Sequence, residues 1–554
     1  MRAEGVAAGH MCEHAAGSNA LRRWEYDGMV GWGEDEDGWQ LAGTTGWSPD
    51  AYVADRGDRP AVIMGESGAV VTYADLATRS RRYAQLLHAA GLQPGDHAAI
   101  LMENHPRYFD AFWGAQRAGL YTTPINWHLK SEEAGYIIED CGAVALVTSA
   151  ALAGLARELE PHLRRVRLRL MVDGTLPGLD SFEDSIAGHA AEPLPDEREG
   201  SWMFYSSGTT GRPKGIKPPL TGERFGESGG MLRGLMQAMY GFGPDSVYLC
   251  PAPLYHAAPL GWSTTAQRLG ATVVVMERFD AEHALALIER HRVTHAQFVP
   301  THFIRMLKLP DEVRARYDLS SLTTAIHAAA PCPVPVKQAM LDWWGPIIYE
   351  YYAGSEGNGF CAIGPQDWLA HPGSVGRSAT AAVHILDEPG DELPTGEAGQ
   401  IWFDSNATFV YHNDAAKTAA AYNSRGWSSL GDIGYLDDEG YLYLTDRASH
   451  MIISGGVNIY PQEVENLLAV HPDVADVAVI GVPNDDLGEE VKAVVIPADR
   501  AAQGPDLAQR IIDHCRANLA HYKCPVTVDF VEELPRLPTG KLLKRELRQR
   551  YWPA

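Results

Sequence analysis

From residue 72 onward, apolar and polar positions follow two patterns, and the first is the periodicity of a helix. A threonine and an aspartate three positions apart, Thr72 and Asp75, can cap a helix N-terminus, and Gly91 ends the periodic stretch that follows them. Large apolar residues recur between these points at helical intervals: Tyr73, Leu76, Tyr83, Leu86 and Leu87. The spacing predicts a helix of about five turns.

Short uninterrupted apolar runs form the second pattern and are typical of buried strands. Residues 97–102 and 143–147 are two such runs, and a helix is expected between them from Pro106 to Gly119. The alternation resumes later, with strands expected at 202–204, 247–249, 271–275, 294–298 and 347–351 and helices at 281–291 and 334–344. This order predicts mostly parallel sheets covered by helices, an α/β fold with ligand sites at the carboxyl ends of the strands.

Composition and periodicity divide the chain into three parts. Residues 1–45 are glycine-rich and acidic without sustained periodicity, which is typical of a flexible leader. Residues 46–448 carry the alternation of strands and helices and are expected to form a large N-terminal domain of stacked sheets. Residues 449–554 are expected to form a small α+β domain, with strands at 452–453, 475–482 and 491–496 and a helix from Pro461.

The composition excludes several classes of protein. The 554 residues include 46 lysines and arginines and 71 aspartates and glutamates, and the net charge of −25 disfavours nucleic-acid and anionic-membrane binding. The seven cysteines are scattered without a C-x-x-C pair, which argues against a disulfide framework or a zinc site and favours a cytoplasmic location. No apolar stretch reaches the roughly 20 residues of a membrane span, so no integral membrane association is expected.

The most informative segment, residues 205–215, reads Tyr-Ser-Ser-Gly-Thr-Thr-Gly-Arg-Pro-Lys-Gly. Its glycines let the backbone bend so that amides face an anion, its hydroxyls add donors, and Lys214 adds a positive charge. This chemistry suits a polyphosphate. The segment has neither the spacing of a Walker loop nor a dinucleotide-binding fingerprint.

This segment resembles the phosphate-binding motif of the acyl-adenylate-forming (ANL) superfamily, which contains acyl-CoA synthetases, adenylation domains of peptide synthetases and luciferases. Other motifs of the family follow in the expected order from about residue 50 to residue 548, and the chain is identified as a member of the AMP-forming acyl-CoA synthetase branch. The resemblance implies a large α/β domain and a small mobile C-terminal domain. It also implies that one set of residues binds ATP: Ser206, Ser207, Gly208, Thr209, Thr210, Gly211 and Lys214.

Residues 350–357, Glu-Tyr-Tyr-Ala-Gly-Ser-Glu-Gly, resemble the adenine and metal motif of the family. By this resemblance Tyr352 stacks on adenine, Ser355 contacts phosphate and Glu356 holds Mg²⁺. A bridging divalent cation is the physical reason to find a carboxylate beside a polyphosphate, since the two anions would otherwise repel each other.

Two further motifs concern the ribose and the junction between the domains. Residues 430–435 resemble the ribose-binding motif, in which Asp432 accepts hydrogen bonds from both ribose hydroxyls. Arg447 is implied to support the ribose from the hinge side. The hinge position two residues later is commonly Lys or Asp in the family and is Ser449 here.

The resemblance also implies the residues that meet the acyl group, the CoA and the reacting carboxylate. The acyl and CoA pocket is implied to contain His256, Ala328, Ala329, Ala330, Gly455 and Gly456. The segment 328–331 reads Ala-Ala-Ala-Pro, where the family often has Gly-Gly-Ala-Pro. Lys541, in a Pro-Thr-Gly-Lys segment, is implied to reach the carboxylate and the α-phosphate, so Lys541, Lys214 and Glu356 are the expected catalytic residues.

The implied activity is a two-step ligation that uses ATP, Mg²⁺ and coenzyme A. A carboxylic acid is converted to acyl-AMP and pyrophosphate, and CoA then takes the acyl group. Three alternatives stay open: transfer to a carrier protein, a luciferase-like oxygenase, and an adenylate-binding protein specialised for one half-reaction. Small alanines and the absence of an obvious cation favour an apolar acyl group, which leaves fatty, aromatic and polycyclic acids, and the chain is compatible with a monomer or a homodimer.

Overall fold

The computed structural model describes residues 46–206, 213–227, 230–447, 450–454, 457–484, 487–536 and 542–552. These described residues belong to one compact unit. The domain boundary expected at residues 448 and 449 therefore stays a prediction, and the leader expected at residues 1–45 lies outside the described residues.

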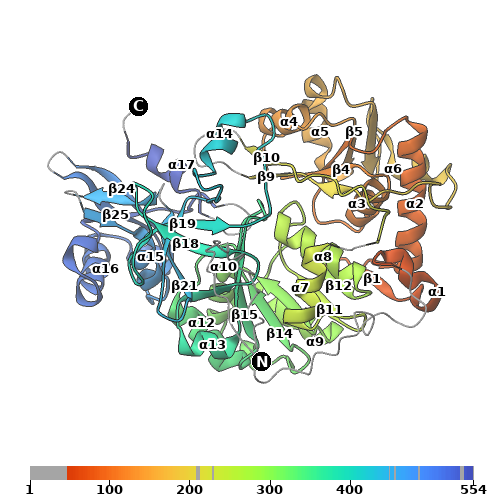
Figure 1. The fold of residues 1–554 in the computed structure, drawn as a ribbon. Coiled ribbons are helices and arrows are strands. Elements are labelled where there is room, and N and C mark those ends of the chain that lie inside the picture. The colour runs from red at the N-terminus through yellow and green to blue at the C-terminus, as the bar shows by residue number, and fades with distance from the viewer. Residues whose placement is uncertain are drawn as a thin grey trace, which may run out of the picture. The chain divides into compact units, whose positions relative to one another are not determined.

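A six-stranded parallel sheet forms the first layer, in the order β7-β6-β5-β3-β4-β8 (Figure 1). Its strands are β3 His97–Leu101, β4 Tyr121–Ile125, β5 Ala145–Ser149, β6 Leu168–Val172, β7 Asp180–Ser181 and β8 Ser201–Trp202. The helices of this part are α1 Val53–Arg56, α2 Tyr73–Ala89, α3 Arg107–Arg117, α4 Ser131–Asp140, α5 Ala153–Glu158 and α6 Phe182–Ala187. The helix predicted after Thr72 is confirmed as α2, and Thr72 and Asp75 form the expected reciprocal cap.

A thirteen-stranded sheet forms the second layer, in the order β18-β19-β20-β21-β17-β16-β15-β14-β13-β11-β12-β1-β2. Its strands are β1 Pro60–Met64, β2 Val70–Thr72, β11 Val247–Cys250, β12 Thr272–Val275, β13 His295–Phe298, β14 Thr324–His327, β15 Ile348–Ala353, β16 Phe360–Ile363, β17 Ser374–Ser378, β18 Ala382–Leu386, β19 Gly399–Asp404, β20 Asp432–Leu436 and β21 Leu442–Arg447. Strands β1 and β11 to β15 pair in parallel, as predicted. At one edge β2 pairs antiparallel with β1, and beyond β15 the strands β16 to β21 add an antiparallel arm that the sequence pattern did not predict.

Eight further helices are described between β8 and the C-terminal part of the chain, and three of them share one apolar core with the parallel strands of the larger sheet. They are α7 Met231–Tyr240, α8 Ala257–Arg268, α9 Ala281–His291, α10 Pro300–Leu307, α11 Asp311–Arg314, α12 Val334–Trp344, α13 Pro365–Ala370 and α14 Ala415–Ala420. Helices α9 and α12 have the predicted bounds. Together with α10 they bury Leu287, Phe303 and Met340 against the sheet.

Two smaller sheets complete the fold. The expected strand at 202–204 is divided, because β8 ends at Trp202 and β9 Phe204–Ser206 pairs instead with β10 Lys214–Ile216 in an antiparallel hairpin. The C-terminal part has the expected α+β character. Its elements are β22 Ile452–Ser454, β23 Val457–Ile459, α15 Pro461–Ala469, β24 Val474–Asn484, β25 Gly488–Pro497, α16 Pro505–Asn518, β26 Thr527–Phe530 and α17 Lys544–Gln549.

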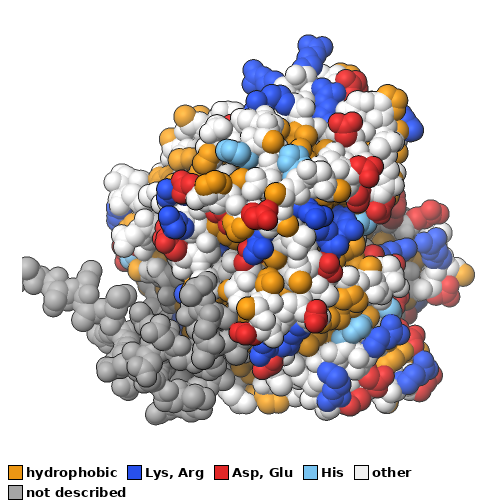
Figure 2. Space-filling view, turned by 90° about the vertical axis from the view of Figure 1, so that its right-hand side faces the viewer, with side chains coloured by type: hydrophobic (Ala, Val, Ile, Leu, Met, Phe, Trp, Pro, Cys, Tyr) orange, Lys and Arg blue, Asp and Glu red, His pale blue; other side chains and the backbone are white. Residues whose placement is uncertain are grey.

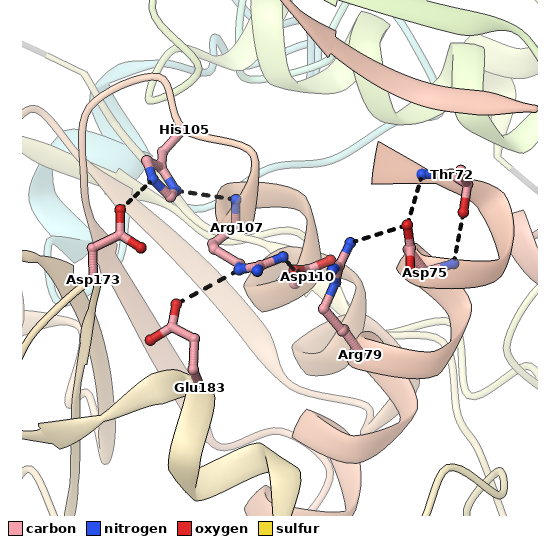
Figure 3. Close-up of polar contacts among 8 residues, drawn as sticks. All are labelled: Thr72, Asp75, Arg79, His105, Arg107, Asp110, Asp173 and Glu183. Atoms are coloured by element: carbon pink, nitrogen blue, oxygen red, sulfur yellow. Dashed lines mark hydrogen bonds and ion pairs between the residues drawn. The ribbon is translucent and has the colours of Figure 1, made fainter. Parts of the chain in front are cut away.

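A network of ion pairs joins α2, α3 and α6 beside the six-stranded sheet (Figure 3). The Asp110 carboxylate is fully buried, and both Arg79 Nε and Arg107 Nη1 lie 3.1 Å from its Oδ2 atom. Burial raises the pKa of Asp110 although the two guanidinium groups oppose this shift. On the face drawn in Figure 2, by contrast, acidic, basic and apolar side chains are interspersed, and exposed ion pairs on such a surface contribute little to stability.

Three histidines are buried in the larger sheet and its helices, and they make the fold sensitive to acid. Burial lowers the pKa of His295 to about 4, that of His302 to about 3, and that of His327 as well, from an ordinary value of 6.5. Below pH 6.5 these histidines are therefore protonated in the unfolded chain but stay neutral in the folded chain. The free energy of unfolding falls as the pH drops below 6.5.

We expect the melting temperature to fall steadily between pH 7 and pH 5. A His302→Gln variant should show a shallower fall, because one of the neutral imidazoles has been removed. Thermal scans across this pH range check the prediction. A melting temperature that is equal at pH 7 and pH 5 would contradict it.

Candidate functional site

The candidate site is built at the carboxyl end of β15, where a glycine-rich turn follows the strand. Gly357 has a positive φ of 69°, and its amide donates to the Gly354 carbonyl over 3.1 Å, which closes the turn around Glu356. A Cβ at Gly354 would lie 2.6 Å from Leu430 Cδ1 and 2.9 Å from Glu356 Oε2. The glycine therefore allows the Glu356 carboxylate to lie directly against the backbone of the turn.

Tyr352 and Asp432 are brought together from strands 80 residues apart in the sequence. The Tyr352 hydroxyl donates to Asp432 Oδ2 over 2.6 Å, a short bond of the charge-assisted kind. Tyr352 is half-buried on β15, and Asp432 is the first residue of β20. The bond fixes one carboxylate oxygen at the hydroxyl edge of an aromatic ring, so that an acceptor for hydroxyl groups and a ring face lie close together, an arrangement suited to a nucleoside.

Lys214 and Glu356 both contact the side chain of Tyr411. Lys214 is the first residue of β10, and its Nζ atom lies 4.4 Å from the centre of the Tyr411 ring. The Tyr411 hydroxyl donates to Glu356 Oε1 over 2.9 Å. The site therefore contains a lysine and a carboxylate within reach of one tyrosine, a combination that can hold an anion and a cation side by side.

Behind the site, β14 and β15 are joined by a buried cluster of three charged or titratable groups. Glu350 Oε2 lies 2.6 Å from Lys337 Nζ and 3.3 Å from His327 Nε2, and the side chains of His327 and Lys337 have no exposed surface. Burial pushes the pKa of Glu350 upward, but His327 and Lys337 outweigh it and lower the pKa to about 2. The carboxylate is thus ionised in the folded protein, two residues before Tyr352.

His256 immediately precedes α8 and lies beside a row of aromatic rings. Its ring centre lies 4.4 Å from that of Tyr255, and the Tyr255 ring lies 6.5 Å from His128, which stacks on Trp127. Burial raises the pKa of the Tyr255 hydroxyl, which keeps it neutral. The four side chains form an aromatic wall of two imidazoles, a phenol and an indole.

A family model described as AMP-binding enzyme matches residues 50–410, and a second, described as AMP-binding enzyme C-terminal domain, matches residues 463–541. The chain belongs to the AMP-binding enzyme family. The long-chain-fatty-acid–CoA ligase FadD13 of Mycobacterium tuberculosis is 32% identical over 87% of this chain and 93% of its own length. Feruloyl-CoA synthase of an Amycolatopsis species is 34% identical over 89% of this chain and 96% of its own length.

Solved structures agree with this membership. The ATP-bound MatB of Rhodopseudomonas palustris matches with a TM-score of 0.76 at 27% identity, over 92% of this chain and 99% of that chain. The protein is therefore an enzyme of the acyl-CoA synthetase branch of the AMP-binding family, which uses a carboxylic acid, ATP and CoA. The predicted fold class is confirmed together with the family.

The structure brings together several of the residues that the motifs predicted for this AMP-binding enzyme. Ser206 and Lys214 face each other in the β9–β10 hairpin, and Ser355 is exposed in the turn after β15. Arg447 ends β21. Other predicted residues lie outside the described part of the chain: Ser207, Gly208, Thr209, Thr210, Gly211, Gly455, Gly456 and Lys541.

The sequence motifs did not predict Tyr411 or the His327–Lys337–Glu350 cluster. Tyr411 directly follows two apolar residues, Phe409 and Val410, and belongs to none of the motifs, so its pattern predicts only a buried side chain. Within the described ranges no group of three or more His, Cys, Asp or Glu residues could hold a metal ion. No helix among these ranges is long and apolar enough to cross a membrane.

Ala329 adopts a backbone conformation that favours glycine. It follows β14 with a φ of 74°, and this is the segment in which the family often has two glycines. A side chain in the left-handed region costs about 1–2 kcal/mol. Ala328 is buried, whereas Ala329 and Ala330 are exposed.

We expect Ala329→Gly to raise the free energy of unfolding by about 1 kcal/mol, because it relieves this strain. Urea unfolding compared with the wild type measures the change. Ala330→Gly is the matched control and should be neutral or destabilising, since Ala330 has no positive φ. A lower stability for Ala329→Gly would contradict the prediction.

Proposed function

We propose that this acyl-CoA synthetase forms acyl-AMP with the residues gathered at the carboxyl end of β15. The observation that supports the proposal most is the convergence there of Lys214, Glu356 and the Tyr352–Asp432 pair, which come from three separate motifs. Tyr352 and Asp432 would hold the adenosine, and Lys214 would hold the triphosphate. Ser206, Ser355, Arg447 and the residues 207–211 complete the proposed ATP site.

In the first step a carboxylate oxygen attacks the α-phosphorus of ATP, and the bond from that phosphorus to pyrophosphate breaks. In the second step the CoA thiol loses its proton to solvent and its sulfur attacks the acyl carbonyl, releasing AMP. Two anions must meet in the first step, so the protein has to supply positive charge where charge builds on the phosphoryl oxygens. Lys214 and Lys541 are the proposed protein cations.

Glu356 fits the role of a magnesium ligand. One of its carboxylate oxygens is bonded to Tyr411, and carboxylate oxygens are the ligands that Mg²⁺ prefers. Since the described residues contain no cluster of several ligands, Glu356 and the phosphate oxygens of the nucleotide would hold the ion between them. When bound, Mg²⁺ would neutralise negative charge on the phosphates.

The acid is proposed to have an apolar acyl group, lodged near His256 and Ala328–Ala330. The aromatic wall beside His256 supports this, because it offers ring faces and few charged groups. One relative named above acts on long-chain fatty acids and another makes feruloyl-CoA, so aliphatic and aromatic acids both belong in the test.

We further propose that residues 46–448 and 449–554 are two domains that rotate between the half-reactions, with Gly455 and Gly456 lining the path of CoA in the second. We also propose that the enzyme forms a homodimer and is located in the cytoplasm. These residues and ranges come from the family motifs, and the separate match of a C-terminal family model to residues 463–541 supports the division.

The function is tested by ATP–pyrophosphate exchange with a panel of fatty, aromatic and polycyclic acids. Exchange with at least one acid, followed by thioester formation only when CoA is added, is the expected result. Exchange without any thioester would instead indicate transfer to a carrier protein or a single half-reaction. The absence of exchange with every acid would contradict the proposed first step.

A further inference from the structure

Tyr411 links two charged residues that come from distant motifs. Its ring lies under the Lys214 ammonium, 4.4 Å from centre to Nζ, and its hydroxyl donates to Glu356 Oε1 over 2.9 Å. One neutral side chain therefore contacts both the lysine proposed for the phosphates and the carboxylate proposed for Mg²⁺.

Several backbone hydrogen bonds hold the segment around Tyr411 in place, so the position of its Cα atom is fixed. Tyr411 forms an antiparallel bridge with Ile216, and the next amide, that of His412, donates to the Gly215 carbonyl over 2.8 Å. The Tyr411 amide donates to Thr418 Oγ1 over 2.9 Å. The segment is thus attached to β10, the strand that Lys214 begins.

The Tyr411 ring is also fixed by packing. The residue is only 7% exposed, and its ring makes an edge contact with Phe409 at 5.4 Å. A ring held in this way loses little freedom when its hydroxyl engages a carboxylate, so the direction of the hydrogen bond is set before any ligand binds.

The chemistry of the two contacts suits a site that has to bind both an anion and a cation. A tyrosine hydroxyl orients a carboxylate without cancelling its negative charge, whereas a lysine or arginine partner would neutralise it. A ring face attracts an ammonium group through its quadrupole and leaves N–H donors for other acceptors. Tyr411 can therefore position both groups while both keep their charge.

We propose that Tyr411 is a positioning residue for acyl-AMP formation, which aims Glu356 at Mg²⁺ and Lys214 at the phosphates of ATP. The inference rests on the roles proposed above for Glu356 and Lys214. It assigns to Tyr411 no contact with the reacting atoms.

The decisive variant is Tyr411→Phe, which removes the hydroxyl and retains the ring. Binding of Mn²⁺, measured by electron paramagnetic resonance in the presence of an ATP analogue with a methylene group between the α- and β-phosphates, should weaken about 10–100-fold. The Mg²⁺ concentration for half-maximal pyrophosphate exchange should rise by a similar factor, while kcat at saturating Mg²⁺ stays near the wild-type value. Affinity for ATP in the presence of EDTA should be unchanged.

Tyr411→Leu separates the contribution of the ring from that of the hydroxyl. Because this variant also loses the face under Lys214, its affinity for ATP in EDTA should fall, in contrast to that of Tyr411→Phe. If the two variants bind ATP equally well in EDTA, the ring of Tyr411 does not position Lys214, and that part of the proposal is wrong.

Tyr422→Phe is the matched control. The Tyr422 hydroxyl accepts from the Phe409 amide over 2.8 Å and donates to the Phe409 carbonyl over 2.9 Å, so it stabilises the same segment without reaching Glu356. This variant should lower the melting temperature and leave Mn²⁺ binding unchanged. If Tyr411→Phe binds Mn²⁺ as the wild type does, or if both variants lose Mn²⁺ binding equally, the positioning role is wrong while the proposed function stands. If the wild type binds neither Mn²⁺ nor the analogue, both are overturned.

Discussion

Replacing Lys337 by methionine is expected to lower the free energy of unfolding by about 3–5 kcal/mol, because it leaves a buried carboxylate without its nearest cation. Lys337 Nζ lies 2.6 Å from Glu350 Oε2, and neither side chain has more than 7% of its surface exposed. The partner that remains is His327, 3.3 Å away, whose own pKa is lowered by burial. The variant is therefore expected to melt on the order of 5–10 °C below the wild type.

The double variant Lys337→Met with Glu350→Leu separates loss of charge compensation from loss of packing. Replacing both members of a buried ion pair by apolar residues is often neutral, so most of the lost stability should return. Thermal and urea unfolding of the wild type, the single variant and the double variant provide the comparison. The prediction would be contradicted if the single variant had the same melting temperature as the wild type. It would also be contradicted if the double variant were less stable than the single one, because charge compensation of Glu350 would then not account for the lost stability.

The Lys337–Glu350 pair also bears on the site. Glu350 stands two residues before Tyr352 on β15, and His327 directly precedes the Ala328–Ala330 segment. A shift of β14 against β15 would change the space between the proposed adenine and acyl surfaces. The KM for ATP should therefore rise in Lys337→Met and return towards the wild-type value in the double variant.

Sequence periodicity predicted the parallel part of the fold because its signals are local. The bounds of α9 and α12 follow from apolar spacing within each segment, and α2 follows from the cap formed by Thr72 and Asp75. The antiparallel arm from β16 to β21 was not predicted, since its strands pair with partners up to about 70 residues away and are interrupted by loops. Its short strands alternate too briefly to be distinguished from turns.

The site shows the same division between local and non-local signals. Glu356, Lys214, Tyr352 and Asp432 were predicted because each lies within a contiguous motif. The contacts among them were not predictable, since the Tyr352–Asp432 bond joins strands 80 residues apart. The sequence around Tyr411 predicted a buried side chain but no function, because its hydroxyl matters only where β10 and the turn after β15 meet.

Lys541→Ala is expected to slow acyl-AMP formation by about 10²–10³-fold, the usual effect of removing one preorganised donor to developing charge, or roughly 3–4 kcal/mol. Lys541 lies outside the described residues, so this expectation comes from its Pro-Thr-Gly-Lys motif and from the chemistry of the step. In that step a carboxylate and a triphosphate, both anionic, must approach each other. Lys214 would keep its contact with the phosphates, but no other proposed cation reaches the attacking carboxylate.

The second half-reaction should be nearly unaffected in Lys541→Ala, because the thiol attacks a mixed anhydride whose formation is complete. Single-turnover formation of acyl-AMP and thioester formation from supplied acyl-AMP measure the two steps separately. Arg545→Ala is the matched control, since Arg545 is an exposed cation on α17, four residues further along, and its removal changes the charge of the same tail. Equal losses in both half-reactions, or equal losses in the two variants, would mean that Lys541 acts through the general charge or stability of this region. A loss confined to acyl-AMP formation and to Lys541→Ala requires a specific contact in the first transition state, because a uniform electrostatic effect could not distinguish the two steps.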